Sequence, residues 1–180
     1  RCFLAAYNLK DGSLAWKAYS TGPDTEMLIG EGFNKDTPEY SALSVYEDVN
    51  GGNKIGGSFK KIPNDQLKIG EKDLGTRTWL KPQAVKDGWQ HGGGSTWGWW
   101  PYDARTNLVY YGIGNPSVWN PDVRPGDNKW SMSVFARDLD TGMAKWAMQK
   151  TPHDEWDYDG INEVILFDKG GKTYAWHHDR

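Results

Sequence analysis

Two stretches of the chain share one pattern of small, polar and aromatic positions. Residues 6–16 and residues 136–146 both read A-x-[ND]-x-x-x-G-x-x-x-W. The pattern predicts a strand, a tight turn built from an Asx residue and a glycine, and a second strand whose tryptophan packs across to a neighbour. Such units cannot bury their faces alone, so we expect stacked four-stranded sheets, as in a β-propeller with about three blades in this chain. The alternative is two coincidental hairpins.

A less regular region separates the two copies. Residues 22–80 show no sustained period, and glycine pairs at 51–52 and 56–57 interrupt a polar, lysine-rich run. Long stretches without periodicity in compact folds are usually surface loops, so residues 33–74 are predicted to be a long loop excursion. Order returns at residues 75–79, and residues 108–111 read as a strand ending at Gly112.

Composition agrees with an all-β fold in one domain spanning residues 1–180. Only 37% of the residues are hydrophobic, yet there are 11 Trp, 9 Tyr and 22 Gly, a mixture typical of short strands joined by glycine turns. The net charge is −3 and basic residues are scattered among acids, which argues against a nucleic-acid partner. No apolar run approaches the ~18 residues of a membrane span. The single cysteine, Cys2, excludes an internal disulfide.

The strongest candidate for chemistry is an acidic stretch at residues 152–160, with four carboxylates within six residues. Pro152 and Gly160 disfavour helix, so an extended backbone is expected, with Asp157 and Asp159 on one face about 6.5 Å apart. Two carboxylates so close would converge on one hard cation. An acidic surface turn is the alternative, although the two interleaved aromatics favour a strand end at a pocket.

Two further segments carry candidate ligands. Three glycines at 92–94 lead to Trp97, whose indole face could support a planar ring, whereas Trp99 and Trp100 are expected to pack in the core. Asn115 follows the strand at 108–111 and precedes a proline. An amide oxygen there could bind a hard cation or could simply start a turn.

Taken together, these motifs resemble one known family. The residues that carry the likeness are Trp97-Gly98-Trp99, Gly114-Asn115-Pro116, residues 124–130, residues 138–146 and residues 152–157. They resemble the large subunit of quinoprotein methanol dehydrogenases, densely from about residue 75 onward and again over residues 1–32. The resemblance implies an eight-bladed β-propeller that holds pyrroloquinoline quinone (PQQ) and a metal ion on its axis. The chain, which starts at Arg1 without a methionine, is expected to be an internal fragment supplying some of the blades.

The resemblance also implies roles for particular residues. It places Trp97 under the PQQ ring, Ser95 and Arg180 in contact with PQQ, Asn115 and Asp157 at the metal, Asp157 as catalytic base, and Trp119 in the wall of the substrate cavity. A glutamate ligand is expected just before residue 1, with a disulfide between adjacent cysteines further upstream.

Asp159 distinguishes two branches of the family. Calcium-type enzymes usually carry alanine at this position, so the aspartate resembles the lanthanide-dependent, XoxF-type branch. The attraction between one extra pair of opposite charges about 4 Å apart, at an effective dielectric near 20, is on the order of 4 kcal/mol before desolvation. This extra attraction favours a trivalent over a divalent ion.

The function implied is oxidation of methanol and other small primary alcohols in the periplasm, by a protein that forms a homodimer. The metal would act as a Lewis acid on the PQQ C5 carbonyl, Asp157 would accept the alcohol proton, and a c-type cytochrome would take the electrons. Two other functions stay open at this point. One is a non-enzymatic propeller scaffold, and the other is a calcium-dependent PQQ enzyme for sugars or larger alcohols, for which a more open cavity than Trp119 suggests is expected.

Overall fold

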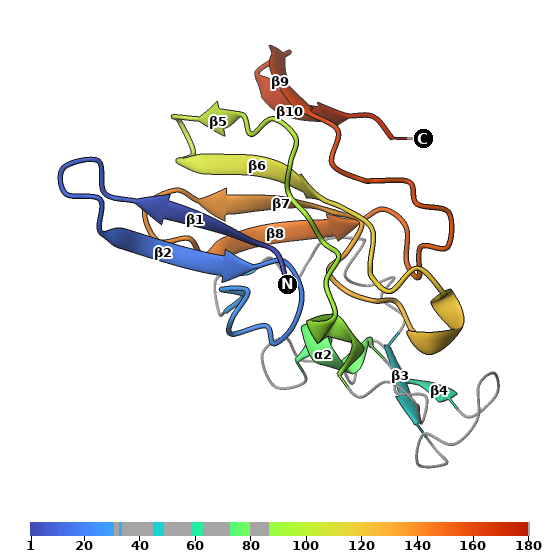
Figure 1. The fold of residues 1–180 in the computed structure, drawn as a ribbon. Coiled ribbons are helices and arrows are strands. Elements are labelled where there is room, and N and C mark those ends of the chain that lie inside the picture. The colour runs from blue at the N-terminus through green and yellow to red at the C-terminus, as the bar shows by residue number, and fades with distance from the viewer. Residues whose placement is uncertain (31–32, 34–44, 49–58, 63–72, 80–86, 180) are drawn as a thin grey trace.

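A four-stranded antiparallel sheet forms the centre of the fold (Figure 1). The structure, a computed structural model, describes residues 1–30, 33, 45–48, 59–62, 73–79 and 87–179. The sheet has the order β5-β6-β7-β8, with bounds Tyr102–Asp103, Leu108–Ile113, Ser133–Asp138 and Ala144–Gln149. Strands consecutive in sequence lie side by side, as in a propeller blade. The predicted all-β class is confirmed.

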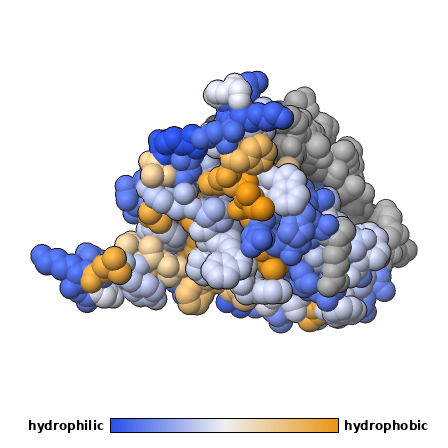
Figure 2. All heavy atoms as spheres, turned by 90° about the horizontal axis from the view of Figure 1, so that it is seen from above, coloured by the Kyte–Doolittle hydropathy of each residue, from blue (hydrophilic) through white to orange (hydrophobic). Residues whose placement is uncertain are grey.

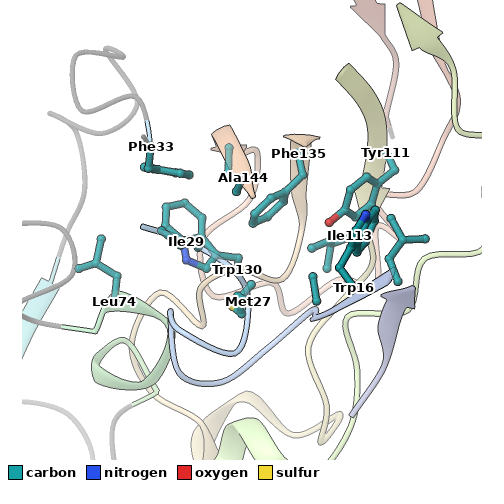
Figure 3. Close-up of a cluster of buried hydrophobic side chains, with 13 residues drawn as sticks. Trp16, Met27, Ile29, Phe33, Leu74, Tyr111, Ile113, Trp130, Phe135 and Ala144 are labelled. Carbon is teal, nitrogen blue, oxygen red and sulfur yellow. The ribbon is translucent and has the colours of Figure 1, made fainter. Parts of the chain in front are cut away.

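A two-stranded hairpin packs on each face of this sheet. The first is β1 (Phe3–Tyr7) with β2 (Leu14–Tyr19), and the second is β9 (Val164–Lys169) with β10 (Lys172–His177). Successive residues of a strand point to opposite faces. On one face Tyr111 and Phe135 pack in a cluster with Trp16 of β2 (Figure 3), and on the other Tyr110 and Val134 pack with Val164 of β9. The described residues thus hold one complete four-stranded sheet and two-stranded parts of a neighbour on each side.

The outer face of the second hairpin carries large apolar side chains. Ile165, Phe167, Tyr174 and Trp176 are between 43% and 51% exposed, and Figure 2, viewed from above Figure 1, shows hydrophobic surface in orange near the middle of this side. An apolar sheet face of this kind is what the next blade of a propeller would cover.

Shorter elements complete the described structure. They are the hairpin β3 (Val45–Asp48) with β4 (Phe59–Ile62), helix α2 (Leu74–Arg77), and two short 3-10 helices, η2 (Gly88–Gln90) and η3 (Pro121–Val123). Apart from β3 and β4, most of residues 33–74, predicted as a loop excursion, lie outside the described residues.

The repeated sequence pattern joins the first hairpin to the central sheet. Trp16, the tryptophan of the first copy, donates its indole N–H to the carbonyl of Leu139 in the second copy at 2.8 Å. Its ring covers Gly142, where an added Cβ would lie 2.5 Å from Trp16 Cδ2. The turn glycines of both copies, Gly12 and Gly142, have the same φ of 73°. The predicted packing of the tryptophan across the gap is therefore confirmed, and it connects the two copies directly.

This contact gives a prediction with a built-in control. Gly142→Ala should destabilise the full-length protein by about 1–3 kcal/mol more than Gly12→Ala, because both place an alanine at a left-handed φ but only the first pushes a methyl group into an indole ring. Apart from its chain neighbours, no described residue has a heavy atom within 4 Å of the Cβ that Gly12 would gain. Denaturant unfolding of the two variants measures the difference. Equal losses would show that the glycine serves only the turn.

Candidate metal and cofactor site

Three segments meet where β6 ends. They are residues 92–98, called here the glycine segment, residues 114–119, called the asparagine turn, and residues 154–161, called the acid loop. The glycine segment runs beside the asparagine turn, with Gly94 N–H donating to Asn115 O at 2.8 Å and Gly114 N–H donating to Ser95 O at 2.9 Å. A Cβ on Gly93 would collide with the backbone of Ser117. The glycines therefore let two backbone segments approach each other closely.

The acid loop rests on two other glycines. A Cβ on Gly112 would collide with the carbonyl oxygen of Gly160, and a Cβ on Gly98 would collide with that of Ile161. The backbone oxygen of Asp159 is 3.0 Å from the Cβ position of Gly114. The loop is thus seated against both β6 and the glycine segment, which brings Asp159 next to the turn that carries Asn115.

The expected extended strand at residues 152–160 is wrong. The backbone there is turn and irregular structure, and Asp157 and Asp159 have positive φ values of 58° and 67°. The cause is the buried carboxylate of Asp154, which accepts the backbone N–H groups of Trp156 at 3.2 Å and Tyr158 at 3.4 Å. Aspartate side chains compete for backbone donors in this way and curl the chain. Side-chain alternation along a strand therefore cannot place the two aspartates on one face.

Asn115 and Asp157 nevertheless line one small hollow. Trp119 forms part of its wall, and the other lining residues are Pro116, Arg124, Asp154 and Glu155. An amide oxygen and a carboxylate facing one space are ligands that suit a hard cation. Within the described ranges no three histidine, cysteine, aspartate or glutamate side chains form a metal-binding group. Two of the candidate ligands are thus brought together, and any complete site needs further oxygen donors.

The other candidates for contact with a cofactor or substrate are Ser95 and Trp97 in the glycine segment, Trp119 in the asparagine turn, and Arg180. Trp97 is 65% exposed and Trp119 is 69% exposed, so both indoles present open faces. Ser95 is partly buried in the glycine segment. Trp99 and Trp100, expected in the core, are instead 78% and 47% exposed. Arg180 lies outside the described residues.

Arg124 is a site residue that the sequence did not reveal. It is 3% exposed, and its guanidinium donates to the carbonyls of Val118 at 2.7 Å, Trp119 at 3.3 Å and Asp154 at 2.6 Å. Burial holds the pKa of Arg124 below its usual value, and the negative charges of Asp154 and Glu155 offset only part of this effect. The arginine thereby ties the wall at Trp119 to the acid loop. The sequence does contain one indication of this role. A proline and a glycine follow Arg124 within an otherwise polar run, and this combination is typical of a tight turn.

Comparison with known proteins identifies the family of the chain. A PQQ family model described as "Glucose/ethanol/alcohol dehydrogenase, beta-propeller domain" matches residues 69–175. The chain is 45% identical over its whole length to "Methanol dehydrogenase [cytochrome c] subunit 1" of Methylorubrum extorquens, of which it covers 24%. It is also 44% identical over its whole length to "Lanthanide-dependent methanol dehydrogenase" of the same organism, of which it covers 25%.

A solved structure of a methanol dehydrogenase is similar to the chain in fold and sequence. The "Europium-containing methanol dehydrogenase" superimposes with a TM-score of 0.72 at 42% identity, covering 98% of this chain and 26% of that one. The fold and the sequence together define a blade region of a PQQ-type β-propeller dehydrogenase. The chain belongs to the family of quinoprotein methanol and alcohol dehydrogenases, as the motifs indicated, and spans about a quarter of the length of these relatives.

In the part of the chain that the structure describes, no helix has the length and apolar character of a membrane span.

Proposed function

We propose that the full-length protein is a PQQ-dependent dehydrogenase that oxidises methanol and other small primary alcohols to aldehydes. The observation that carries the proposal is that Asn115 and Asp157 line one hollow whose wall includes Trp119. The hollow lies in a chain 45% identical to a methanol dehydrogenase subunit. When bound, PQQ supplies the two-electron redox chemistry, assisted by a metal ion that polarises its reactive carbonyl.

The residues of the chain have distinct parts in this proposal. Asn115, Asp157 and Asp159 would hold the metal, since their oxygen atoms suit a hard cation. Trp97 would support the PQQ ring, with Ser95 and Arg180 in contact with the cofactor, a role that fits the exposed indole of Trp97. Trp119 would limit the size of the alcohol.

Asp157 would accept the proton of the alcohol hydroxyl. Oxidation of a primary alcohol to an aldehyde releases two electrons and two protons, so a base beside the substrate lowers the barrier. Asp157 is partly buried at the hollow, where it can meet both a cation and a small substrate. We propose that the electrons pass one at a time to a c-type cytochrome, in line with the acceptor named for the subunit 1 relative.

We also propose a periplasmic location and a homodimer for the full-length protein, and a lanthanide as its metal. The two Methylorubrum extorquens relatives, one of them named lanthanide-dependent, are almost equally similar to this chain. Overall identity therefore does not choose the metal. Asp159, whose backbone oxygen lies against Gly114 of the asparagine turn and whose side chain would add a carboxylate to the site, is the residue that supports a trivalent ion.

Reconstitution tests the proposed function. Full-length protein stripped of metal and PQQ should be inactive, and adding PQQ with a light lanthanide should restore methanol oxidation measured with an artificial electron acceptor. PQQ without metal should give little activity, because the carbonyl is then not polarised. Glucose serves as the comparison substrate. Faster oxidation of glucose with calcium would favour the sugar-oxidising alternative, and no oxidation of any alcohol or sugar would favour a scaffold.

A further inference from the structure

Lys150 uses all three of its ammonium protons on three different groups. Its Nζ lies 2.8 Å from the carbonyl oxygen of Gly160, 2.6 Å from Asp179 Oδ2 and 2.7 Å from His177 Nε2. A lysine ammonium has three donors and no acceptor, so its hydrogen-bonding capacity is full. Its side chain is 11% exposed. Such a saturated, nearly buried lysine fixes the relative positions of its partners.

The first partner, Gly160, is already confined on its other side. It adopts a φ of 67°, and an added Cβ would lie 2.9 Å from Met132 Sδ and 3.0 Å from Ile113 O. Gly160 directly follows Asp159 and lies three residues after Asp157. Holding the carbonyl of Gly160 therefore holds the part of the acid loop that carries both aspartates.

The other two partners lie at the end of β10 and just after it. His177 ends that strand and Asp179 immediately precedes Arg180. The backbone N–H of Lys150 donates to Met132 O at 2.8 Å, which anchors the lysine beside the sheet. One side chain thus joins the end of β8, the acid loop and the segment that leads to the arginine expected to contact PQQ.

We propose that Lys150 is a positioning residue for the alcohol oxidation proposed above, on which this inference rests. Its ammonium holds the acid loop so that Asp157 and Asp159 keep their places relative to the segment at residues 177–179. An apolar side chain of similar length would leave the Gly160 carbonyl and the Asp179 carboxylate without this donor, and the loop would shift. Loss of such a supporting partner typically lowers metal affinity or activity ~10- to 100-fold.

Three variants of the full-length protein, reconstituted with PQQ and metal, test this role. Lys150→Met should lower kcat about 10- to 100-fold, with a smaller change in KM because the lysine does not line the hollow. Lys150→Arg should recover much of the loss, since it keeps the charge and several donors. Lys145→Met is the matched control, because Lys145 is an exposed lysine on β8, the strand that ends just before Lys150, and should keep the wild-type kcat.

A second measurement does not depend on turnover. Each variant is loaded with PQQ and Eu³⁺, and the luminescence lifetimes in H₂O and D₂O give the number of waters on the ion. In Lys150→Met a displaced carboxylate should be replaced by water, which raises that number and shortens the lifetime. If Lys150 only stabilised the fold, Lys150→Met would lower the melting temperature. It would change neither the kcat measured well below that temperature nor the number of waters on the ion. That result would overturn the proposal.

The outcomes also separate this inference from the proposed function. If the wild type neither binds Eu³⁺ nor oxidises alcohols, the proposed function itself is wrong. If the wild type does both and Lys150→Met behaves like Lys145→Met, only the positioning role is rejected. Should Lys150→Met fail to fold, Lys150→Gln, which keeps an N–H donor without the charge, is judged by the same two measurements.

Discussion

Asp157→Asn in the full-length protein should lower kcat by about 10²- to 10⁴-fold, the usual contribution of a general base. The exchange keeps an oxygen beside the metal site but removes the proton acceptor. It should also leave the loop intact, because Asp157 has a φ of 58° and asparagine is one of the few residues that tolerate this left-handed conformation. Steady-state kinetics after reconstitution with PQQ and metal measure the effect, with PQQ absorbance confirming that the cofactor is bound.

Glu155→Gln is the matched control for this result. Glu155 lines the same hollow, with a side chain 46% exposed, so its replacement also removes one negative charge from the site. If loss of charge alone were responsible, the two variants would lose similar activity. We expect Glu155→Gln to change kcat far less. An Asp157→Asn enzyme retaining more than about a tenth of the wild-type kcat would remove Asp157 from the role of base.

The packing of the first hairpin onto the sheet could be predicted from the sequence because it depends on a local pattern. The spacing of an Asx residue, a glycine and a tryptophan sets a hairpin, and Trp16 then reaches the matching glycine of the next copy, Gly142. Such a pattern needs no knowledge of distant residues. The candidates Asn115 and Asp157 were likewise found as a polar residue after a strand and as part of an acidic cluster, and they line one hollow.

The shape of the acid loop could not be predicted, since interactions beyond the local backbone determine it. Asp154 turns its carboxylate inward to two backbone donors of the loop, and Gly112, more than forty residues earlier, provides the space in which the loop lies. Period-two reasoning assumes a chain that bonds to a neighbouring strand. Once a side chain takes the backbone donors, that assumption fails.

Burial of charged residues was also beyond the sequence patterns. Arg124 and Lys129 belong to a run that reads as polar and exposed, yet they are 3% and 1% exposed. The amine of Lys129 donates to Gln149 Oε1 at 2.7 Å. Burial lowers the pKa of Lys129 to about 8, and the negative charge of Asp127 offsets only part of this effect. Buried charges persist when distant groups satisfy their hydrogen bonds. Hydropathy along one chain carries no information about those partners.

The choice of metal should depend on Asp159. If Asp157, Asp159 and the upstream glutamate expected from the family surround one ion, their charge is about −3, which balances a trivalent ion and exceeds that of a divalent one. The structure supports a place near this site, because the backbone of Asp159 lies against Gly114, next to Asn115. This backbone contact, and not alternation along a strand, brings Asp159 close to Asn115.

Asp159→Asn is the informative change, because Asp159 has a φ of 67° that asparagine tolerates, whereas Asp159→Ala adds backbone strain of about 1 kcal/mol. Asparagine reduces the negative charge of the site from about −3 to about −2. Lanthanide-supported activity and lanthanide affinity should therefore fall much more than calcium binding. The upper limit of the difference is the ~4 kcal/mol of one charge pair, before desolvation reduces it. Apo-protein reconstituted with PQQ and either La³⁺ or Ca²⁺ gives the ratio of the two. If Asp159 only stabilises the turn at Gly160, both variants should lose about 1 kcal/mol of stability. Both should then keep the wild-type ratio of La³⁺-supported to Ca²⁺-supported activity. The lanthanide assignment would in that case lose its support.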